Sequence, residues 1–221
     1  RSSLDMRIFD NNGKLLDFKQ EGKNDDFAYL VRFSKKSADG WGLSKSYTPN
    51  AIEDGGMRDN TDFDKRNMNI YLGKVGNGTE QGLRITTIEN ENGIPVFTSG
   101  KKRYWRYTDW DKKQYSYNYI KEQKNSRIEA IIFRDTYYNV LDSYDDNTYT
   151  TQLTGKAFHS TYDDVSDGMR IVPEFKLKDM NLSFLIYYKE DEHTEQDDLG
   201  VAWEEFSAKT SSYAIASDFR N

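Results

Sequence analysis

The sequence of 221 residues contains no cysteine. A chain without thiols forms no disulfide, offers no thiolate nucleophile and builds no Cys-ligated zinc or iron–sulfur site, which excludes several classes of enzyme. The absence does not fix the compartment. It suits a cytosolic protein, and it equally suits a bacterial surface protein that avoids mispairing in an oxidising space.

Apolar residues are also scarce. They make up 36% of the chain, and charged residues make up 31%, against about 45–50% and about 25% in typical globular domains. No stretch approaches the roughly 18 consecutive apolar residues of a membrane-spanning helix, so we predict no transmembrane segment. The chain starts at Arg1 without an initiator Met or a signal-peptide pattern, so we expect a processed or trimmed product.

Motifs for several kinds of chemistry are missing. The sequence has no nucleophile elbow of the serine hydrolases, no P-loop and no dinucleotide-binding glycine pattern. The net charge of −6 argues against nucleic acid as a partner, because that affinity depends largely on Lys and Arg. We predict no cofactor, and the sequence leaves open whether the protein is an enzyme.

Metal-binding patterns are weak. The two histidines, His159 and His193, are too far apart for an HExxH site, so we expect structural roles, with a raised pKa for His193 among its acidic neighbours. The run from Asp163 to Gly168, followed by Glu174, nearly fits a calcium-binding EF-hand loop. Because Val165 occupies a ligand position and no helix flanks the run, we predict an acidic hairpin turn, and no metal site is assigned. A calcium site of another kind is the alternative.

Aromatic residues, by contrast, are abundant. The chain has 4 Trp, 16 Tyr and 12 Phe, and each such ring buries on the order of 150–250 Å². A small number of large side chains can therefore build a core, and disorder is rejected. Domains of this length are common among β proteins, so we predict one β domain over residues 1–221, with a possible subdivision near residue 100.

Alternation of apolar and polar residues with period two indicates β-strands. Asp10–Gly13 reads as a hairpin turn, Ser44–Arg66 as a long loop, and apolar spacing over Leu199–Ala208 as one short helix. The predicted fold is therefore mainly β: an antiparallel β-sandwich, jelly roll or barrel with a C-terminal helix. The expected strands are Leu4–Phe9, Lys14–Lys19, Phe27–Ser34, Met68–Val75, Leu83–Glu89, Ile94–Thr98, Arg103–Thr108, Gln114–Lys121, Arg127–Arg134, Thr136–Leu141, Thr148–Leu153, Lys156–Tyr162, Ile171–Leu177 and Leu182–Lys189, with turns at Asn90–Gly93 and Tyr144–Asn147.

The stretch from Lys101 to Tyr119 combines rings and cations. If it forms strands, its three tyrosines lie on one face, Trp105 and Tyr107 lie on another, and two arginines lie within reach of the rings. Such a surface suits sugar or peptide recognition, although cross-strand ring pairs also hold sheets together. The candidate ligand-binding residues are Arg103, Trp105, Arg106, Tyr107, Trp110, Tyr115, Tyr117 and Tyr119.

These observations favour a secreted or cell-surface domain that binds a host protein or a glycan through the aromatic and basic stretch. The composition, rich in Lys, Asn, Asp and Tyr, is typical of bacterial or viral surface domains. Two alternatives stay open: a carbohydrate-active enzyme (a glycoside hydrolase or polysaccharide lyase) on a jelly roll, and a β-barrel that binds a small ligand. The sequence identifies neither the partner nor the oligomeric state.

Overall fold

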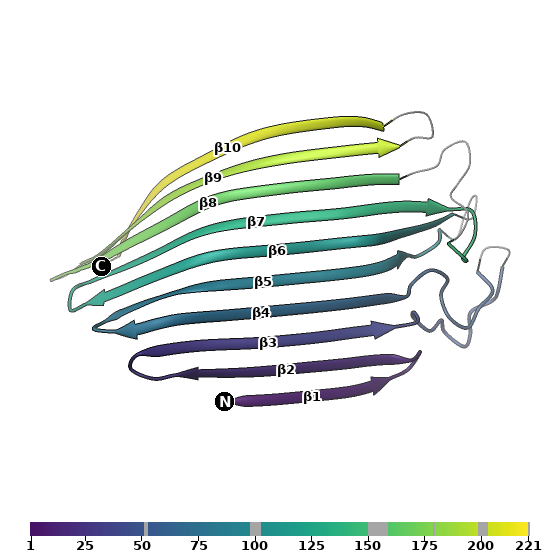
Figure 1. Cartoon of the computed structure of the whole chain (residues 1–221), viewed down its shortest axis with the longest axis horizontal. Coiled ribbons are helices and arrows are strands. Elements are labelled where there is room, and N and C mark those ends of the chain that lie inside the picture. Colours follow the sequence, from purple (N-terminus) through teal and green to yellow (C-terminus); the bar gives the residue numbers. More distant parts are fainter. Residues whose placement is uncertain (51–52, 98–102, 150–158, 179, 199–202, 221) are drawn as a thin grey trace.

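The computed structural model describes residues 1–50, 53–97, 103–149, 159–178, 180–198 and 203–220, and all regular elements of these ranges are β-strands (Figure 1). The strands are β1 (Ser2–Phe9), β2 (Gly13–Lys23), β3 (Phe27–Ala38), β4 (Phe63–Gly76), β5 (Thr79–Ile94), β6 (Tyr104–Gln123), β7 (Ser126–Tyr144), β8 (His159–Leu177), β9 (Met180–Asp198) and β10 (Trp203–Arg220).

The ten strands form one antiparallel sheet in which each strand pairs with the next along the chain. Strands β1 and β10 lie at the two edges, so the sheet is open over the residues that are described. Figure 1 shows a single curved layer, with the bend clearest from β7 to β10. The prediction of a mainly β, antiparallel fold is confirmed.

The two ends of the sheet differ in their connections. At one end, on the left of Figure 1, the strands are joined through residues 24–26, 77–78, 124–125 and 178–179. At the other end the connections comprise residues 10–12, 39–62, 95–103, 145–158 and 199–202, most of which are longer. We call these the turn end and the loop end.

The predicted C-terminal helix is wrong. Residues 199–202 lie outside the described part of the chain, and from Trp203 onward the backbone is strand β10. Its ladder with β9 runs from the pair Trp203–Asp198 to the pair Arg220–Asn181. A short apolar run fits helical and extended spacing alike, and this long ladder of backbone hydrogen bonds decides between them.

Other predicted boundaries are also corrected. The acidic hairpin turn expected at Asp163–Gly168 lies within β8, and the turn expected at Asn90–Gly93 lies within β5, where the register to β6 shifts between Glu89 and Asn92. Polar residues inside long strands resemble turns in sequence. In addition, the runs at 127–134 and 136–141 form one strand, and so do residues 104–108 and 114–121. Of the runs at 94–98 and 148–153, only Ile94 among the described residues lies in a strand, as the last residue of β5. Strand β4 begins inside the predicted loop, at residue 63.

The hairpin predicted at Asp10–Gly13 is confirmed. Phe9 pairs with Gly13, and Asn11 and Asn12 adopt positive φ angles of 61° and 54°. Asparagine tolerates this left-handed conformation better than most residues. The first hairpin is therefore encoded locally.

Few apolar side chains are buried in the described part of the chain, and most of them lie near the loop end. They are Ala28, Ala38, Tyr71, Val96, Tyr104, Val140, Leu141 and Val172. Only two of these are aromatic, so the abundant rings do not build a core of the expected kind. Most large apolar side chains lie on the surface of the sheet instead.

Candidate functional site

The strand register assigns every side chain in the sheet to one of two faces. Directly paired residues of antiparallel strands point to the same side, and successive residues alternate. Starting from Leu4, one line of paired residues crosses the whole sheet through Phe18, Phe33, Met68, Thr87, Lys113, Thr136, Val165, Glu192 and Lys209. We call the face that carries Leu4 the apolar face and the opposite one the polar face.

A continuous band of large apolar side chains crosses the apolar face from β1 to β10. Its members are often well exposed: Leu83 is 63%, Ile132 60% and Ile215 85% exposed. We call this band the apolar belt. It consists of Leu4, Met6, Ile8, Leu16, Phe18, Phe27, Tyr29, Val31, Phe33, Met68, Ile70, Leu72, Leu83, Ile85, Tyr115, Tyr117, Tyr119, Ile128, Ala130, Ile132, Met169, Ile171, Pro173, Phe175, Leu177, Met180, Leu182, Phe184, Ile186, Tyr188, Tyr213, Ile215 and Phe219.

The belt crosses the strands at a slant. The line of pairs from Met6, the middle belt residue of β1, meets β10 at Ser207, whereas the belt in β10 is centred on Ile215. This drift is about 26 Å along the strand, over a sheet width of about 43 Å, at about 3.3 Å per residue and 4.8 Å per strand. The strands are therefore tilted by about 30° from the normal to the belt. Along β8 the belt extends from Met169 to Leu177, about 26 Å.

The polar face carries a network of hydrogen bonds between neighbouring strands. The Arg32 Nη2 donates to Asp17 Oδ2 at 2.8 Å, and Arg84 Nη1 donates to Asn69 Oδ1 at 2.8 Å. Asn69 in turn donates to the hydroxyl of Thr86 at 2.8 Å. These side chains satisfy one another's hydrogen-bonding groups.

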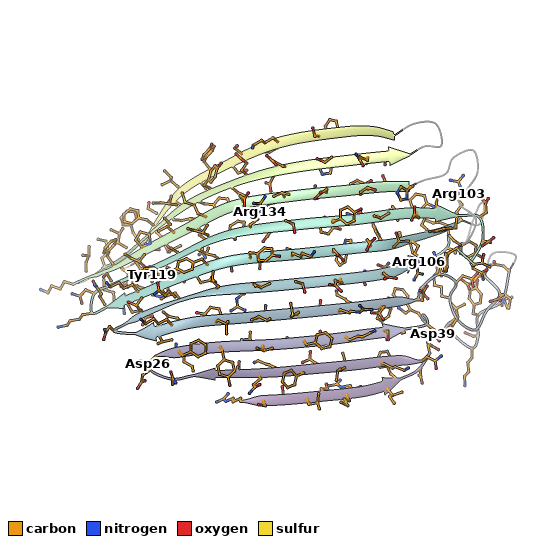
Figure 2. The ribbon with its side chains drawn as sticks, viewed as in Figure 1. Asp26, Asp39, Arg103, Arg106, Tyr119 and Arg134 are labelled. Carbon is orange, nitrogen blue, oxygen red and sulfur yellow. The ribbon has the colours of Figure 1, made fainter. Side chains whose placement is uncertain are left out.

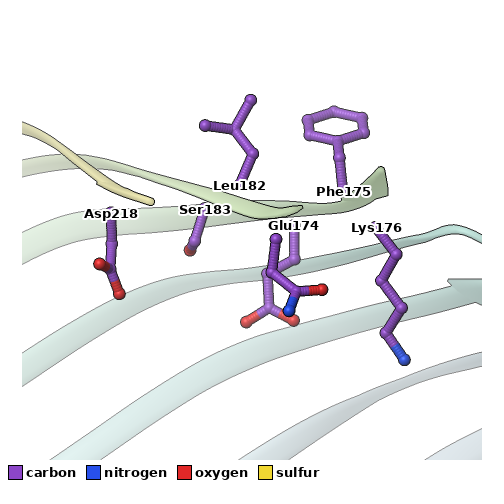
Figure 3. A pocket seen from close by; sticks show the side chains of 7 residues that line it. Glu174, Phe175, Lys176, Leu182, Ser183 and Asp218 are labelled. Carbon is purple, nitrogen blue, oxygen red and sulfur yellow. The ribbon is translucent and has the colours of Figure 1, made fainter. Parts of the chain in front are cut away.

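Figure 3 shows this division at the turn end of β8 and β9. The side chains of Phe175 and Leu182 project to one side of the ribbons, and those of Glu174 and Asp218 project to the other. The residues line a shallow pocket between β8, β9 and β10. The alternation thus continues to the last residues of the strands.

At the loop end, a group of polar side chains fixes the 39–62 connection to the sheet. Arg106 forms a two-pronged ion pair with Asp62, at 2.9 and 2.7 Å. The Asn60 amide donates to the carbonyl oxygens of Ile94 and Trp105, both at 2.7 Å. We call Asn60, Asp62, Arg106 and Tyr149 the loop-end cluster.

Tyr149 completes the loop-end cluster from the connection between β7 and β8. Its hydroxyl donates to Asn60 Oδ1 at 2.6 Å, and its ring lies 4.8 Å from the Arg106 guanidinium, a cation–π distance. Burial, reinforced by the charge of Asp62, raises the pKa of the Tyr149 hydroxyl. The hydroxyl therefore keeps its proton and remains a hydrogen-bond donor.

The eight predicted ligand-binding residues do not form one surface. Tyr115, Tyr117 and Tyr119 share the apolar face, as expected, and belong to the belt. Trp105 and Tyr107 share the polar face, also as expected, beyond a register shift at Tyr107–Asp109.

Trp110 lies on the polar face too, where its indole N–H donates to the Tyr137 hydroxyl. Arg106 belongs to the loop-end cluster. Figure 2 shows Arg103 at the loop end and Tyr119 toward the turn end. The ligand-binding role of these residues stays a prediction.

The histidines each contact a carboxylate. His159 contacts Asp142, and His193 contacts Asp164, with Glu195 at 3.7 Å. His193 lies between the belt and the loop end, and its hydrogen bond to Asp164 raises its pKa. The residues of the predicted EF-hand-like run alternate between the two faces of β8, so their oxygens do not converge on one ion.

One group of carboxylates lies close together in the 39–62 connection: Glu53, Asp54 and Asp59, with oxygens within 4.8 Å of one another. The Glu53 side chain is almost fully buried, and its carboxylate accepts the backbone N–H of Asp59 at 3.1 Å. The buried carboxylate therefore has a structural partner inside the connection. This accounts for its burial.

The main feature that the sequence analysis missed is the belt. Its signal is present in runs such as Met68, Ile70 and Leu72, where apolar residues occupy alternate positions. The period was recognised, but the apolar face of each strand was assigned to a core. Across the residues described, no helix has the length and apolarity needed to cross a membrane.

Comparisons with known proteins identify the fold and no family. No family model and no curated protein matches the sequence. Among solved structures, the chain is similar to the copper transporter OprC, with a TM-score of 0.77 and 12% identity over 99% of this chain and 34% of that one. It is also similar to BauA, the ferric preacinetobactin receptor from Acinetobacter baumannii, with a TM-score of 0.51 and 13% identity over 92% and 37% of the two chains. The chain spans about a third of the length of these proteins.

Proposed function

We propose that the chain forms part of the wall of a membrane-spanning β-barrel that takes up or binds a small ligand. In this proposal the apolar belt faces lipid and the polar face lines the interior. The observation that carries it is the belt itself: a continuous, exposed apolar band on one face only, backed by a hydrogen-bonded polar face.

The size of the belt favours a lipid environment over water. It is roughly 20 Å high and 43 Å wide, close to 900 Å² in projection, whereas the largest apolar patch of a soluble monomer is about 300–600 Å². Its extent of about 26 Å along β8 matches the roughly 25 Å lipid-facing band of known membrane barrels. The tilt of about 30° also supports the proposal, because strands must slant when a sheet closes into a barrel.

The backbone is also compatible with lipid. In an antiparallel sheet each inner strand pairs with a neighbour on both sides, so its N–H and C=O groups need no water. Strands β1 and β10 each have one unpaired side within the described chain. In a bilayer these edges require partners, so the proposal includes further strands that complete the wall.

The absence of long apolar runs, from which we predicted no transmembrane segment, concerns spanning helices. A spanning strand carries apolar side chains only at every second position. The segment Met68–Leu72 in β4 has this pattern, with Asn67 and Asn69 on the opposite face. Mean composition therefore underestimates the apolar surface of such a protein.

The ligand is proposed to enter from the loop end. In membrane barrels the longer loops lie on the outer side and the short turns on the inner side, which orients this sheet. The names of the two similar structures, a copper transporter and the receptor of an iron chelate, support uptake of a small ligand. Of the predicted site residues, those of the loop end and polar face (Arg103, Trp105, Arg106, Tyr107 and Trp110) are suited to contact it, whereas the three tyrosines of the belt are proposed to face lipid.

Vesicle flotation of matched variants tests this proposal. The full chain, folded into phosphatidylcholine vesicles, is expected to float with the lipid and to resist a carbonate wash. Leu83→Asp in the belt is expected to reduce the washed, vesicle-bound fraction, and Asn118→Asp on the polar face to leave it unchanged, because only the first places a charge in lipid. Equal retention of the two variants on the vesicles would refute the proposal.

A further inference from the structure

A row of cations follows the margin of the belt at the loop end. Each lies on the apolar face, two residues from a belt residue in the direction of the loop end. The row, which we call the cation row, is Lys14 in β2, Lys35 in β3, Arg66 in β4, Lys113 in β6 and Arg134 in β7. Figure 2 shows Arg134 within the span of β7, away from the loops.

The cation row has the slant of the belt. Lys35 and Arg66 are direct register partners. Lys14 is displaced from them by two residues toward the loop end. Lys113 is displaced toward the turn end, and Arg134 is displaced farther in the same direction. From strand spacing and rise, neighbouring members are about 5–12 Å apart. At the opposite margin of the belt, the strands described carry only Lys74 and Lys121 on this face.

Three members of the cation row are exposed. Lys14 and Lys113 make no ion pair with the residues described and are open to a ligand. Arg134 is 58% exposed and forms an ion pair with Asp167 at 3.8 Å, so it is open to a ligand on its remaining side. Arginine and lysine both bind phosphate oxygens through charge-assisted hydrogen bonds.

The other two members are partly neutralised. Lys35 pairs with Asp64 at 3.0 Å, and Arg66 contacts Asp64 at 3.3 Å and Glu89 at 4.0 Å. Asp64 and Asp111 lie two residues farther from the belt than Arg66 and Lys113 on the same strands. Glu89 and Asp167, by contrast, are the direct register partners of Arg66 and Arg134. Beside Lys14 and Lys113, an anion at the belt margin therefore meets the cations before the acids.

The geometry points to the phosphate-bearing, anionic headgroup of a membrane lipid as the partner of the cation row. This rests on the proposed function, because the lipid tails would cover the apolar belt while the headgroup meets the cations. Long Lys and Arg side chains reach from an apolar surface toward a charged interface, and basic residues at such a margin attract anionic lipids. The occupant is a lipid of the leaflet at the loop end, not a soluble anion.

Spin-labelled lipids in vesicles test this inference. The full chain is folded into phosphatidylcholine vesicles, and the association of spin-labelled phosphatidic acid is compared with that of spin-labelled phosphatidylcholine. One or two cations contacting each lipid give an expected preference for phosphatidic acid of about fivefold to thirtyfold. The preference should weaken as salt is added, because ions screen the attraction.

Two triple variants separate the cation row from overall charge. Lys14→Gln, Lys113→Gln and Arg134→Gln together should reduce the preference to near unity. The control, Lys36→Gln, Lys65→Gln and Lys112→Gln, removes the same charge from the polar face and should retain it. Equal loss in both triple variants would overturn the inference.

The outcomes also separate this inference from the proposed function. If neither labelled lipid shows the restricted motion of protein contact, the belt does not face lipid and the proposed function fails. If both lipids are restricted but equally associated, only the cation row fails. Displacement of phosphatidic acid by excess inorganic phosphate would indicate a soluble-anion site and would likewise overturn the inference.

Discussion

Replacing Leu83 by Arg measures how much the apolar belt depends on lipid. Leu83 is 63% exposed and points to the apolar face between Leu72 and Tyr117. Tyr117 lies midway between Lys113 and Lys121, the cations at the two margins of the belt in β6, so Leu83 lies near the middle of the belt. An exposed Leu→Arg change in water alters stability by about 0.5 kcal/mol or less, whereas the same charge at the midplane of a bilayer destabilises a barrel by about 2–4 kcal/mol. The expected loss for Leu83→Arg in vesicles is therefore about 2–4 kcal/mol.

The control for this prediction is Asn118→Arg. Asn118 lies between the belt residues Tyr117 and Tyr119 in β6, but its side chain is on the polar face. There it donates a hydrogen bond to the Ser116 hydroxyl at 3.2 Å. Loss of one such hydrogen bond costs about 0.5–1.5 kcal/mol, so the control should lose about 1 kcal/mol. Reversible urea unfolding in vesicles, followed by tryptophan fluorescence, gives both free energies. Equal losses, or a loss below about 1 kcal/mol for Leu83→Arg, would refute the assignment of this face to lipid.

Two further predictions concern the loop end and pH. Asn60→Ala removes three hydrogen bonds that hold the 39–62 connection, each of which contributes about 1 kcal/mol. Opening of the connection should therefore become easier, and tryptic cleavage after Lys45 should accelerate by about a hundredfold. An unchanged cleavage rate would contradict the role of Asn60. The raised pKa of His193 means that its pairing with Asp164 stabilises the fold fully below about pH 6.5 and less as pH rises through the folded-state pKa. NMR titration should place that pKa above about 6.5 and lower it in Asp164→Asn, and no difference between the two proteins would disprove the coupling.

The sequence predicted the class of fold because period two survives in nearly every strand. Leu4, Met6 and Ile8 alternate with polar residues, and Asn11 and Asn12 supply the left-handed turn that follows. Both signals are local, and both were confirmed. The shared face of Tyr115, Tyr117 and Tyr119 followed from the same rule and needed no tertiary information.

What the sequence did not reveal depends on non-local pairing. Alternation shows that a strand separates two environments, but it does not say which of them is water. The belt became visible only when the register aligned residues such as Leu83 and Ile132 across strands far apart in sequence. Asp163–Gly168 resembled a turn because its neighbours on β7 and β9, which hold it extended, were unknown.

The prediction of the site residues was also limited by the lack of information on non-local pairing. Lys101–Tyr119 is one stretch of sequence, and its rings were treated as one surface. Because a strand presents successive residues to opposite faces, the stretch divides between the belt and the polar face. Arg106 joins Asp62 and Tyr149, which lie in connections before and after it in the chain, and no local pattern predicts that meeting.

A cysteine scan along β4 tests the central claim most directly, because the natural chain has no cysteine to interfere. Each position from Asn67 to Leu72 is replaced singly by Cys, labelled with an environment-sensitive fluorophore and placed in vesicles containing brominated lipid. We predict strong lipid quenching at positions 68, 70 and 72, and quenching by aqueous iodide at positions 67, 69 and 71. A profile without this period of two, or one with iodide quenching at every position, would contradict the assignment of the apolar belt to a membrane.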